Sequence, residues 1–195
     1  MLLLDSGHDP GDFPVTRSGG KPVRNVHQRH ISASREEVGG LLDSLSGTHD
    51  RLWPFENWPP MRLRGPLGVG AQGGHGPIRY RVEDYEPGVR VSFRFTSPRG
   101  FLGTHAFQVN GEDGSTVLRH IIDMRTTGAA RLSWPLVFGP LHDALMEDCL
   151  DKAEAVLRGE VVPRPRWPSR VRVLRAVGRW LQRRGMKRRR APSRV

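Results

Sequence analysis

The sequence predicts an α+β domain in which an antiparallel sheet wraps around one long helix near the C-terminus. Two observations lead to this fold class. Between residues 76 and 126, four successive segments alternate apolar and polar residues, as half-buried antiparallel strands do. Residues 138–159, which follow them, repeat apolar residues at the three- and four-residue spacing of an amphipathic helix. Because such a helix must bury its apolar face, we expect it to pack on the strands.

Charge divides the 195-residue chain into a domain and a tail. The net charge is +11, yet from Arg164 onward there are thirteen Lys and Arg residues and no acid. The preceding part carries eighteen basic and twenty acidic residues and is nearly neutral. We predict a flexible N-terminal arm (1–21), rich in Gly, Asp, Pro and Ser, a folded domain (22–160) and a basic tail (161–195).

The expected cellular setting follows from one thiol and from the lack of long apolar runs. A single cysteine, Cys149, excludes an intramolecular disulfide and permits a reducing cytoplasm. It falls on the apolar side of the predicted helix, so we expect a buried, unreactive thiol. The opening "MLLLDSGHDPGDFP" is too short in apolar residues for a signal peptide or a membrane span. We expect a cytoplasmic protein, peripheral to the inner membrane face if its tail binds lipid.

The first third of the domain predicts a strand, a short helix and an irregular connection. Residues 22–33 resemble a strand whose alternation is disturbed by His27 and His30. Ser34 and Glu37 then form a capping box that starts a short helix. Residues 51–76 hold many prolines, aromatics and glycines, with a short strand near 61–63. The glycines lack the Lys-Ser/Thr ending of a phosphate loop, so we expect a mobile or bulged strand connection.

Clearer strands and the long helix follow. The strand segments are "GPIRYRVEDYEP", "GVRVSFRFTSP", "GFLGTHAFQVN" and "STVLRHIIDMRT", the last two joined by the turn "NGEDGS". In the helix, Pro140 suits the first turn and Gly159 suits a left-handed C-terminal cap. The apolar face contains Leu141, Leu145, Cys149, Ala153 and Val156, and the opposite face contains Asp143, Glu147, Asp151 and Glu154.

This order of elements resembles the START-like helix-grip superfamily (SRPBCC), which includes polyketide cyclases and lipid-transfer-type proteins. The similar segments are "ISAS" before "REEVGGLLDSL", the meander "IRYRVEDYEPGVRVSFRF", "GTHAFQV", "TVLRHIIDM" and the helix "LHDALMEDCLDKAEAVL". The resemblance covers about residues 22–160. It implies a curved sheet around the long helix and an apolar cavity for a lipid, sterol, quinone or polyketide. Because the superfamily has no invariant catalytic motif, the resemblance implies a fold more than an activity.

Three histidines are the candidate polar groups of such a cavity. If Val109 pairs with Thr116 across the hairpin, His105 faces His120, and both project with Phe107 and Ile122 toward the concave face. His142 lies on the apolar side of the helix, in its first turn. We therefore predict that three imidazoles face one cavity, where burial keeps them neutral.

Three interpretations of these histidines remain open. They fill space with local hydrogen bonds, they anchor or transfer protons to a ligand carbonyl or hydroxyl, or they bind a metal such as zinc. No carboxylate or cysteine completes a metal site and no nucleotide fingerprint is present, so we expect neither a metal nor a cofactor. Asp143, next to His142, is expected to serve the helix N-terminus rather than a His–Asp dyad. Tyr80, Phe93, Phe95 and Trp134 are further candidates for the cavity wall, or for plain core.

The basic tail predicts an amphipathic helix over about residues 169–184. An apolar stripe alternates with arginines, and tryptophans flank it; the functional candidates are Trp167, Arg172, Arg175, Arg179, Trp180 and Arg183. Such a helix could bind an anionic membrane surface, dock on the domain or on a partner protein, or make non-specific contact with nucleic acid. The fourth alternative is that the tail is disordered and only solubilises the protein. Specific nucleic-acid binding is not expected.

The preferred functional hypothesis is binding of a small hydrophobic ligand, without established catalysis. One alternative is a polyketide cyclase or aromatase-type enzyme that uses His105, His120 or His142 for proton transfer. Another is a membrane- or partner-docking adaptor that acts through the tail.

Overall fold

The computed structural model describes residues 19–112 and 115–190, without the side chains of Glu112 and of residues 182–190. The arm predicted over 1–21 lies outside this part up to residue 18, as do the side chain of Arg183 and the tip of the predicted turn at 110–115. Described residues form seven antiparallel strands in one sheet, in the order β1-β7-β6-β5-β4-β3-β2. The bounds are β1 (Lys21–Ile31), α1 (Arg35–Asp43), β2 (Arg62–Leu63), β3 (Gln72–His75), β4 (Ile78–Glu86), β5 (Arg90–Ser97), β6 (Phe101–Glu112), β7 (Ser115–Thr126), α2 (Ala130–Ser133), a π-helical turn η1 (Trp134–Phe138), α3 (Gly139–Arg158) and α4 (Ser169–Arg190).

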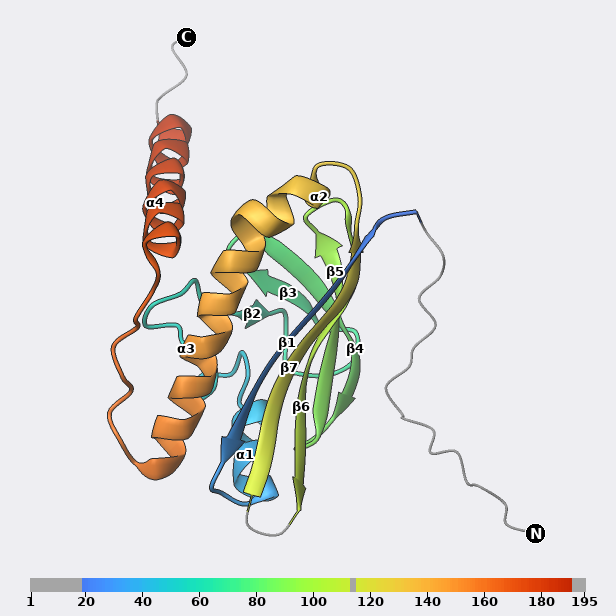
Figure 1. Ribbon diagram of the computed structural model, residues 1–195, viewed down its shortest axis with the longest axis vertical. Helices are drawn as coiled ribbons and strands as arrows, with labels where there is room; N and C mark the ends of the chain where they lie inside the picture. Colours follow the sequence, from blue (N-terminus) through green and yellow to red (C-terminus); the bar gives the residue numbers. More distant parts are fainter. Residues whose placement is uncertain (1–18, 113–114, 191–195) are drawn as a thin grey trace, which may run out of the picture.

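The predicted fold class is confirmed: a bent antiparallel sheet holds the long helix α3 against one of its faces (Figure 1). Alternate residues of each central strand are buried on this face, such as Val91 and Phe93 of β5 and Leu118 and Ile122 of β7. Helix α3 packs against this face with its own buried side chains, which are those of Leu145, Met146, Cys149, Leu150 and Ala153. Burial of apolar surface between these two layers stabilises the domain.

Local sequence signals mark the start of α1 and the end of α3. Ser34 accepts a hydrogen bond from the Glu37 backbone while the Glu37 carboxylate accepts one from the Ser34 backbone, which is the capping box predicted at the start of α1. Gly159 ends α3 in the left-handed conformation, with a φ of 68°. The helical chain begins earlier than predicted, at Ala130, and passes through η1 before α3. Pro135 within η1 has no backbone donor, which favours this wider turn over a regular one.

The hairpin register differs from the prediction. Val109 pairs with Leu118, Phe107 with His120 and His105 with Ile122, which is a shift of two residues. The reason is that the strands continue to the pair Glu112–Ser115, so the connection is centred one residue later than the expected turn at 110–115. Because side chains alternate with a period of two, the shift leaves the histidines on the predicted face.

Part of the glycine-rich stretch, Gln72–His75, forms strand β3, where a mobile or bulged strand connection was expected. A Cβ atom on Gly73 would lie 1.9 Å from the Arg62 carbonyl oxygen, and one on Gly74 would lie 2.0 Å from the Ile78 carbonyl oxygen. Glycine is therefore required where β3 passes between β2 and β4.

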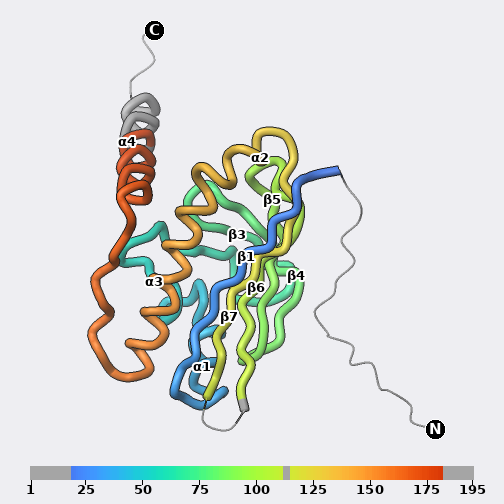
Figure 2. Tube along the Cα trace, in the orientation of Figure 1, coloured from blue at the N-terminus to red at the C-terminus, as the bar shows by residue number. Residues whose placement is uncertain are grey.

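After α3 the chain doubles back and reaches α4, on the side of α3 away from β1 (Figure 2). Helix α4 begins at Ser169, as predicted for the tail, and continues beyond the expected end to Arg190. Within the described residues, no helix combines the length and the apolar character needed to cross a bilayer.

Candidate ligand cavity

A cavity of about 870 Å³ lies between the sheet, the start of α3, the segment around Trp53–Pro59 and α4. Six of the nine side chains predicted to contact a ligand line it: Phe95, His105, His120, Ile122, Trp134 and His142. Its volume falls within the range of pockets that hold small molecules. Trp134 reaches the cavity from η1, so the π-helical turn borders the space in which a ligand would lie.

The other three predicted residues lie behind the wall. Tyr80, Phe93 and Phe107 are at most 1% exposed and do not line the cavity. Phe93 stacks on the His105 ring at a centroid distance of 4.9 Å, and the Tyr80 ring meets the same imidazole edge-on, also at 4.9 Å. These rings fix the orientation of His105, so their contribution is to position a polar group rather than to contact a ligand.

His105 and His120 are joined by one hydrogen bond. Nδ1 of His105 lies 3.3 Å from Nε2 of His120, so one nitrogen donates and the other accepts. The two outer nitrogens, Nε2 of His105 and Nδ1 of His120, are buried, and neither has a hydrogen-bond partner among the residues that the structure describes. Each imidazole therefore keeps an unused polar atom in an apolar setting, at a cost that a ligand hydroxyl or carbonyl would remove.

His142 approaches this pair from α3. Its ring centroid lies 5.0 Å from that of His120, and in the described part of the chain neither of its buried nitrogens has a hydrogen-bond partner. Asp143 Oδ1 lies 3.8 Å from His142 Nδ1, which is too long for a hydrogen bond. The two residues thus form no catalytic dyad, and the three histidines predicted to share one cavity do lie together.

A fourth cavity histidine, His75, was not predicted. It is the last residue of β3; its Nδ1 lies 3.3 Å from the Tyr80 hydroxyl and its ring lies 4.7 Å from that of Trp53. It was missed because the glycines before it were interpreted as a connection. The two glycines have no side chains, so apolar–polar alternation did not mark this strand in the sequence.

Burial keeps these imidazoles neutral. Desolvation lowers the pKa of His105 and of His120 well below the ordinary value of 6.5, and repulsion between neighbouring imidazoles adds to the shift. Desolvation also lowers the pKa of His142, and that of His75 to about 3. Each ring can therefore present one donor and one acceptor at neutral pH.

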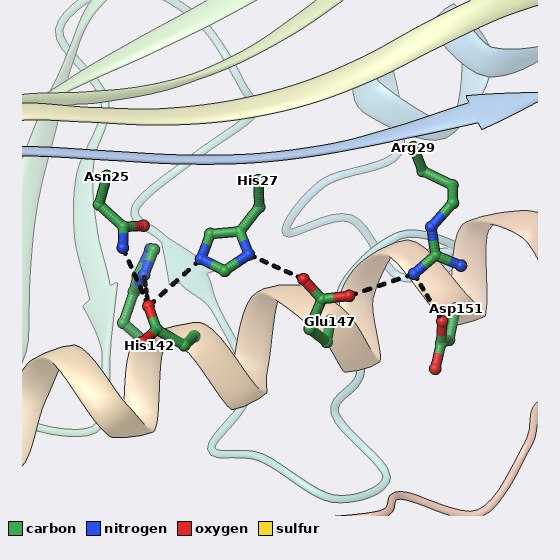
Figure 3. Close-up of polar contacts among 7 residues, drawn as sticks. Asn25, His27, Arg29, His142, Glu147 and Asp151 are labelled. Carbon is green, nitrogen blue, oxygen red and sulfur yellow. Dashed lines mark hydrogen bonds and ion pairs between the residues drawn. The ribbon is translucent and has the colours of Figure 1, made fainter.

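The polar flank of α3 contacts strand β1 rather than solvent alone (Figure 3). Both ring nitrogens of His27 contact carboxylates, Nε2 at 3.2 Å from Asp143 and Nδ1 at 2.8 Å from Glu147. Arg29 binds Glu147, Asp151 and Glu154 at 2.9–3.2 Å. Hydrogen bonding to Asp143 and Glu147 raises the pKa of His27, despite its partial burial. The prediction that Asp143 serves the helix N-terminus is therefore wrong.

These contacts explain the disturbed alternation of the first strand. Its inward side chains include Asn25, His27 and Arg29, which meet the acidic flank of α3, while Val23 and Ile31 border the apolar core. Asn25 donates to Asp143 at 3.0 Å. An edge strand beside a helix can thus be polar on its inner face when the helix supplies the matching charges.

Among the described residues, the possible metal-ligand cluster is not the histidine set considered from the sequence. His27, His142 and Asp143 place one ligand atom each within 4.8 Å of one another. Both nitrogens of His27 already contact carboxylates, so ion pairing accounts for this cluster without a metal.

The predicted tail residues are divided between the domain and solvent. The Arg175 guanidinium lies between the rings of Trp58 and Trp167, 4.1 and 3.9 Å from their centroids. Both indole N–H groups donate to Asp148 Oδ2, at 2.6 Å from Trp58 and 2.9 Å from Trp167. Arg172, Arg179 and Trp180 are exposed. Docking on the domain, one of the alternatives for the tail, thus describes the first turns of α4.

Comparison with known proteins adds solved structures of similar fold. No protein-family model matches the sequence, and no curated protein matches it significantly. Truncated norcoclaurine synthase from Thalictrum flavum superposes with a TM-score of 0.54 at 15% identity, over 73% of this chain and 98% of that one. CalU16 from Micromonospora echinospora superposes with a TM-score of 0.52 at 15% identity, over 84% of this chain and 96% of that one. A protein from Thermobifida fusca superposes with a TM-score of 0.54 at 15% identity, over 68% of this chain and 91% of that one.

These neighbours are Bet v1-like and SRPBCC proteins, and they match the domain rather than a single motif. At such low identity the likeness shows the fold alone. Together with the sheet order and the position of α3, it establishes that this chain has the START-like helix-grip fold predicted from its sequence.

Proposed function

We propose that this protein binds a small, largely apolar ligand that carries a hydroxyl or carbonyl group. The observation that carries the proposal is the cavity of about 870 Å³, whose apolar wall is interrupted by buried imidazole nitrogens without partners. An apolar body would displace water from the wall, and its polar group would satisfy His105, His120 or His142. A lipid, a quinone or a polyketide-like molecule meets both requirements.

Similar folds hold such molecules. Norcoclaurine synthase from Thalictrum flavum has been solved with dopamine and hydroxybenzaldehyde, two aromatic molecules with polar groups. Its structure superposes on this chain with a TM-score of 0.53 at 14% identity, over 77% of this chain and 98% of that one. This supports the class of ligand, not its identity.

Binding can be tested with the neutral fluorescent probe 1-aminoanthracene and by mass spectrometry of organic extracts of the purified protein. Leu141 lines the cavity, so Leu141→Trp should fill part of it and weaken probe binding by tenfold or more, since about 1.4 kcal/mol corresponds to a factor of ten. Leu132→Trp is the matched control because Leu132 is 69% exposed and does not line the cavity. Equal affinities for the two variants would contradict the proposal.

A second candidate function is proton transfer to a bound ketone, and the hydrogen bond between His105 and His120 favours it. A neutral imidazole can accept a proton from a carbon next to a carbonyl, and its partner can stabilise the resulting cation. Incubation with 2-tetralone in deuterated water tests this, since base catalysis would replace the α-protons by deuterium. His105→Ala with His120→Ala should abolish exchange but leave 1-aminoanthracene binding measurable; exchange at the wild-type rate would exclude the role.

A further inference from the structure

The apolar surface of α4 is wider than the part that the domain covers. Val171 is 2% exposed, and Leu174, Gly178 and Leu181 line the cavity at its mouth. On the neighbouring strip of the helix, Val173 is 60% and Trp180 50% exposed, and Val177, at the border of the two strips, is 49% exposed and also lines the cavity. Helix α4 therefore presents one apolar strip to the cavity and a second one to the surroundings, next to each other.

The start of α4 is held firmly enough to keep this arrangement. Arg175 is enclosed by two indole rings and donates to the Asn57 carbonyl oxygen. Asp148, 9% exposed, fixes both indoles through its Oδ2 atom. A cation between aromatic faces gains more when it is partly withdrawn from water. These contacts attach the start of α4, and with it the exposed strip, beside the mouth of the cavity.

Charge indicates what this surface meets. Arg172 and Arg179 are exposed, and Arg179 also borders the cavity mouth; the segment from Arg164 onward contains thirteen basic residues and no acid. Aliphatic residues and a tryptophan beside arginines are typical of helices that lie in the interface of an anionic bilayer, where arginine side chains extend to phosphates. Contact with nucleic acid would use the arginines but not the valines, and a second copy would bring like charges together.

We propose that α4 binds the surface of anionic phospholipid bilayers and thereby places the cavity mouth against the lipid. This inference rests on the proposed function and adds a source to it: the ligand is an amphiphile that enters from the membrane. The exposed strip inserts among acyl chains, while the adjacent strip, formed by Leu174, Gly178 and Leu181, borders an apolar path from bilayer to cavity.

Co-sedimentation of the full chain with vesicles tests the docking step. Vesicles of phosphatidylcholine alone are compared with vesicles that contain about one-third phosphatidylglycerol, and we expect binding to the second kind only, weakened by salt. The double variant Arg172→Gln, Arg179→Gln should reduce the affinity for these vesicles about 30-fold, because each basic residue near such a surface contributes about 1 kcal/mol of binding free energy. Arg62→Gln with Arg81→Gln is the matched control, since these exposed arginines lie on the sheet.

The apolar strip is tested separately by Val173→Ser with Trp180→Ser, which should weaken vesicle binding without changing the net charge. Transfer of 1-aminoanthracene from loaded vesicles to the protein should accelerate when phosphatidylglycerol is present. This acceleration should fall in Arg172→Gln alone, because Arg172 is exposed and does not line the cavity.

Equal binding of the two arginine pairs, or no binding to anionic vesicles, would overturn the inference. Binding to duplex DNA without binding to vesicles would overturn it in favour of nucleic acid. If the free probe still binds in those cases, the proposed function stands alone. If vesicles bind but the free probe does not, the docking surface stands and the ligand cavity fails.

Discussion

Replacing two cavity histidines, His105→Phe with His120→Leu, should make the stability of the protein less sensitive to acid. In the unfolded chain a histidine titrates near pH 6.5, whereas desolvation holds the pKa of both residues well below that value in the fold. Below about pH 6.5 the unfolded state therefore binds more protons than the native state, and the free energy of unfolding decreases as the pH decreases. Their contribution is present above the unfolded pKa and is lost progressively as the pH falls from there toward the lower folded pKa.

The size of the effect can be worked from His75, whose folded pKa is about 3. Between about pH 7.5 and pH 5 this residue alone costs about 2 kcal/mol of unfolding free energy, from about 1.4 kcal/mol per pH unit once the unfolded form is protonated. His105 and His120 act in the same direction, so removing both should reduce the slope below pH 6 by about 2–3 kcal/mol per pH unit. His27 acts oppositely: Asp143 and Glu147 raise its pKa, so its contribution is present below 6.5 and lost as pH rises through the folded value.

Urea unfolding followed by circular dichroism between about pH 5 and pH 7.5 measures this slope directly. At the neutral end the double variant should be at least as stable as wild type within about 1 kcal/mol. Two unpartnered nitrogens disappear together with the one hydrogen bond between the rings, and Phe can keep the stack on Phe93. His30→Gln on the exposed side of β1 is the control. A double variant with the wild-type pH slope would refute the reasoning.

Three further outcomes are expected from single sites. Cys149 is fully buried and burial raises its pKa, so a thiol reagent should label the native protein at least a hundredfold more slowly than the urea-unfolded protein; equal rates would place the thiol at the surface. Trp167→Ala should cost about 1–2 kcal/mol of docking energy, seen as faster hydrogen exchange in α4 with unchanged exchange in α3. Gly73→Ala should lower the unfolding free energy by about 1–3 kcal/mol. Gly68→Ala should change it little, because the space that the new Cβ atom would occupy is open. Similar losses at both positions would contradict the close approach of β3.

The sequence predicted the helix and the central strands because their periodicity is strong. In α3 the inward residues recur without interruption from Leu145 to Ala153, and Gly159 marks the end. The hairpin was predicted on the correct face but in the wrong register. A period of two distinguishes faces, while the pairing partner depends on where the turn falls.

The candidate site was harder to predict because part of it depends on packing between distant segments. The histidines of β6 and β7 could be placed by alternation, and they line the cavity. The share of α4 in its wall and the role of His75 depend on how the tail and the glycine-rich strand fold back, which no local pattern specifies. The same holds for Asn25, whose inward position makes sense only beside the acidic flank of α3.

The share of α4 in the cavity wall affects where this protein can be shortened. The similar solved structures cover 68–84% of the chain, which would suggest an expression boundary near residue 160. Cutting there would strip Trp58 and Asp148 of Trp167 and Arg175, leaving an indole and a carboxylate uncovered at the rim. A shortened protein would therefore have a wider, wetter opening, and its affinities would underestimate those of the intact chain.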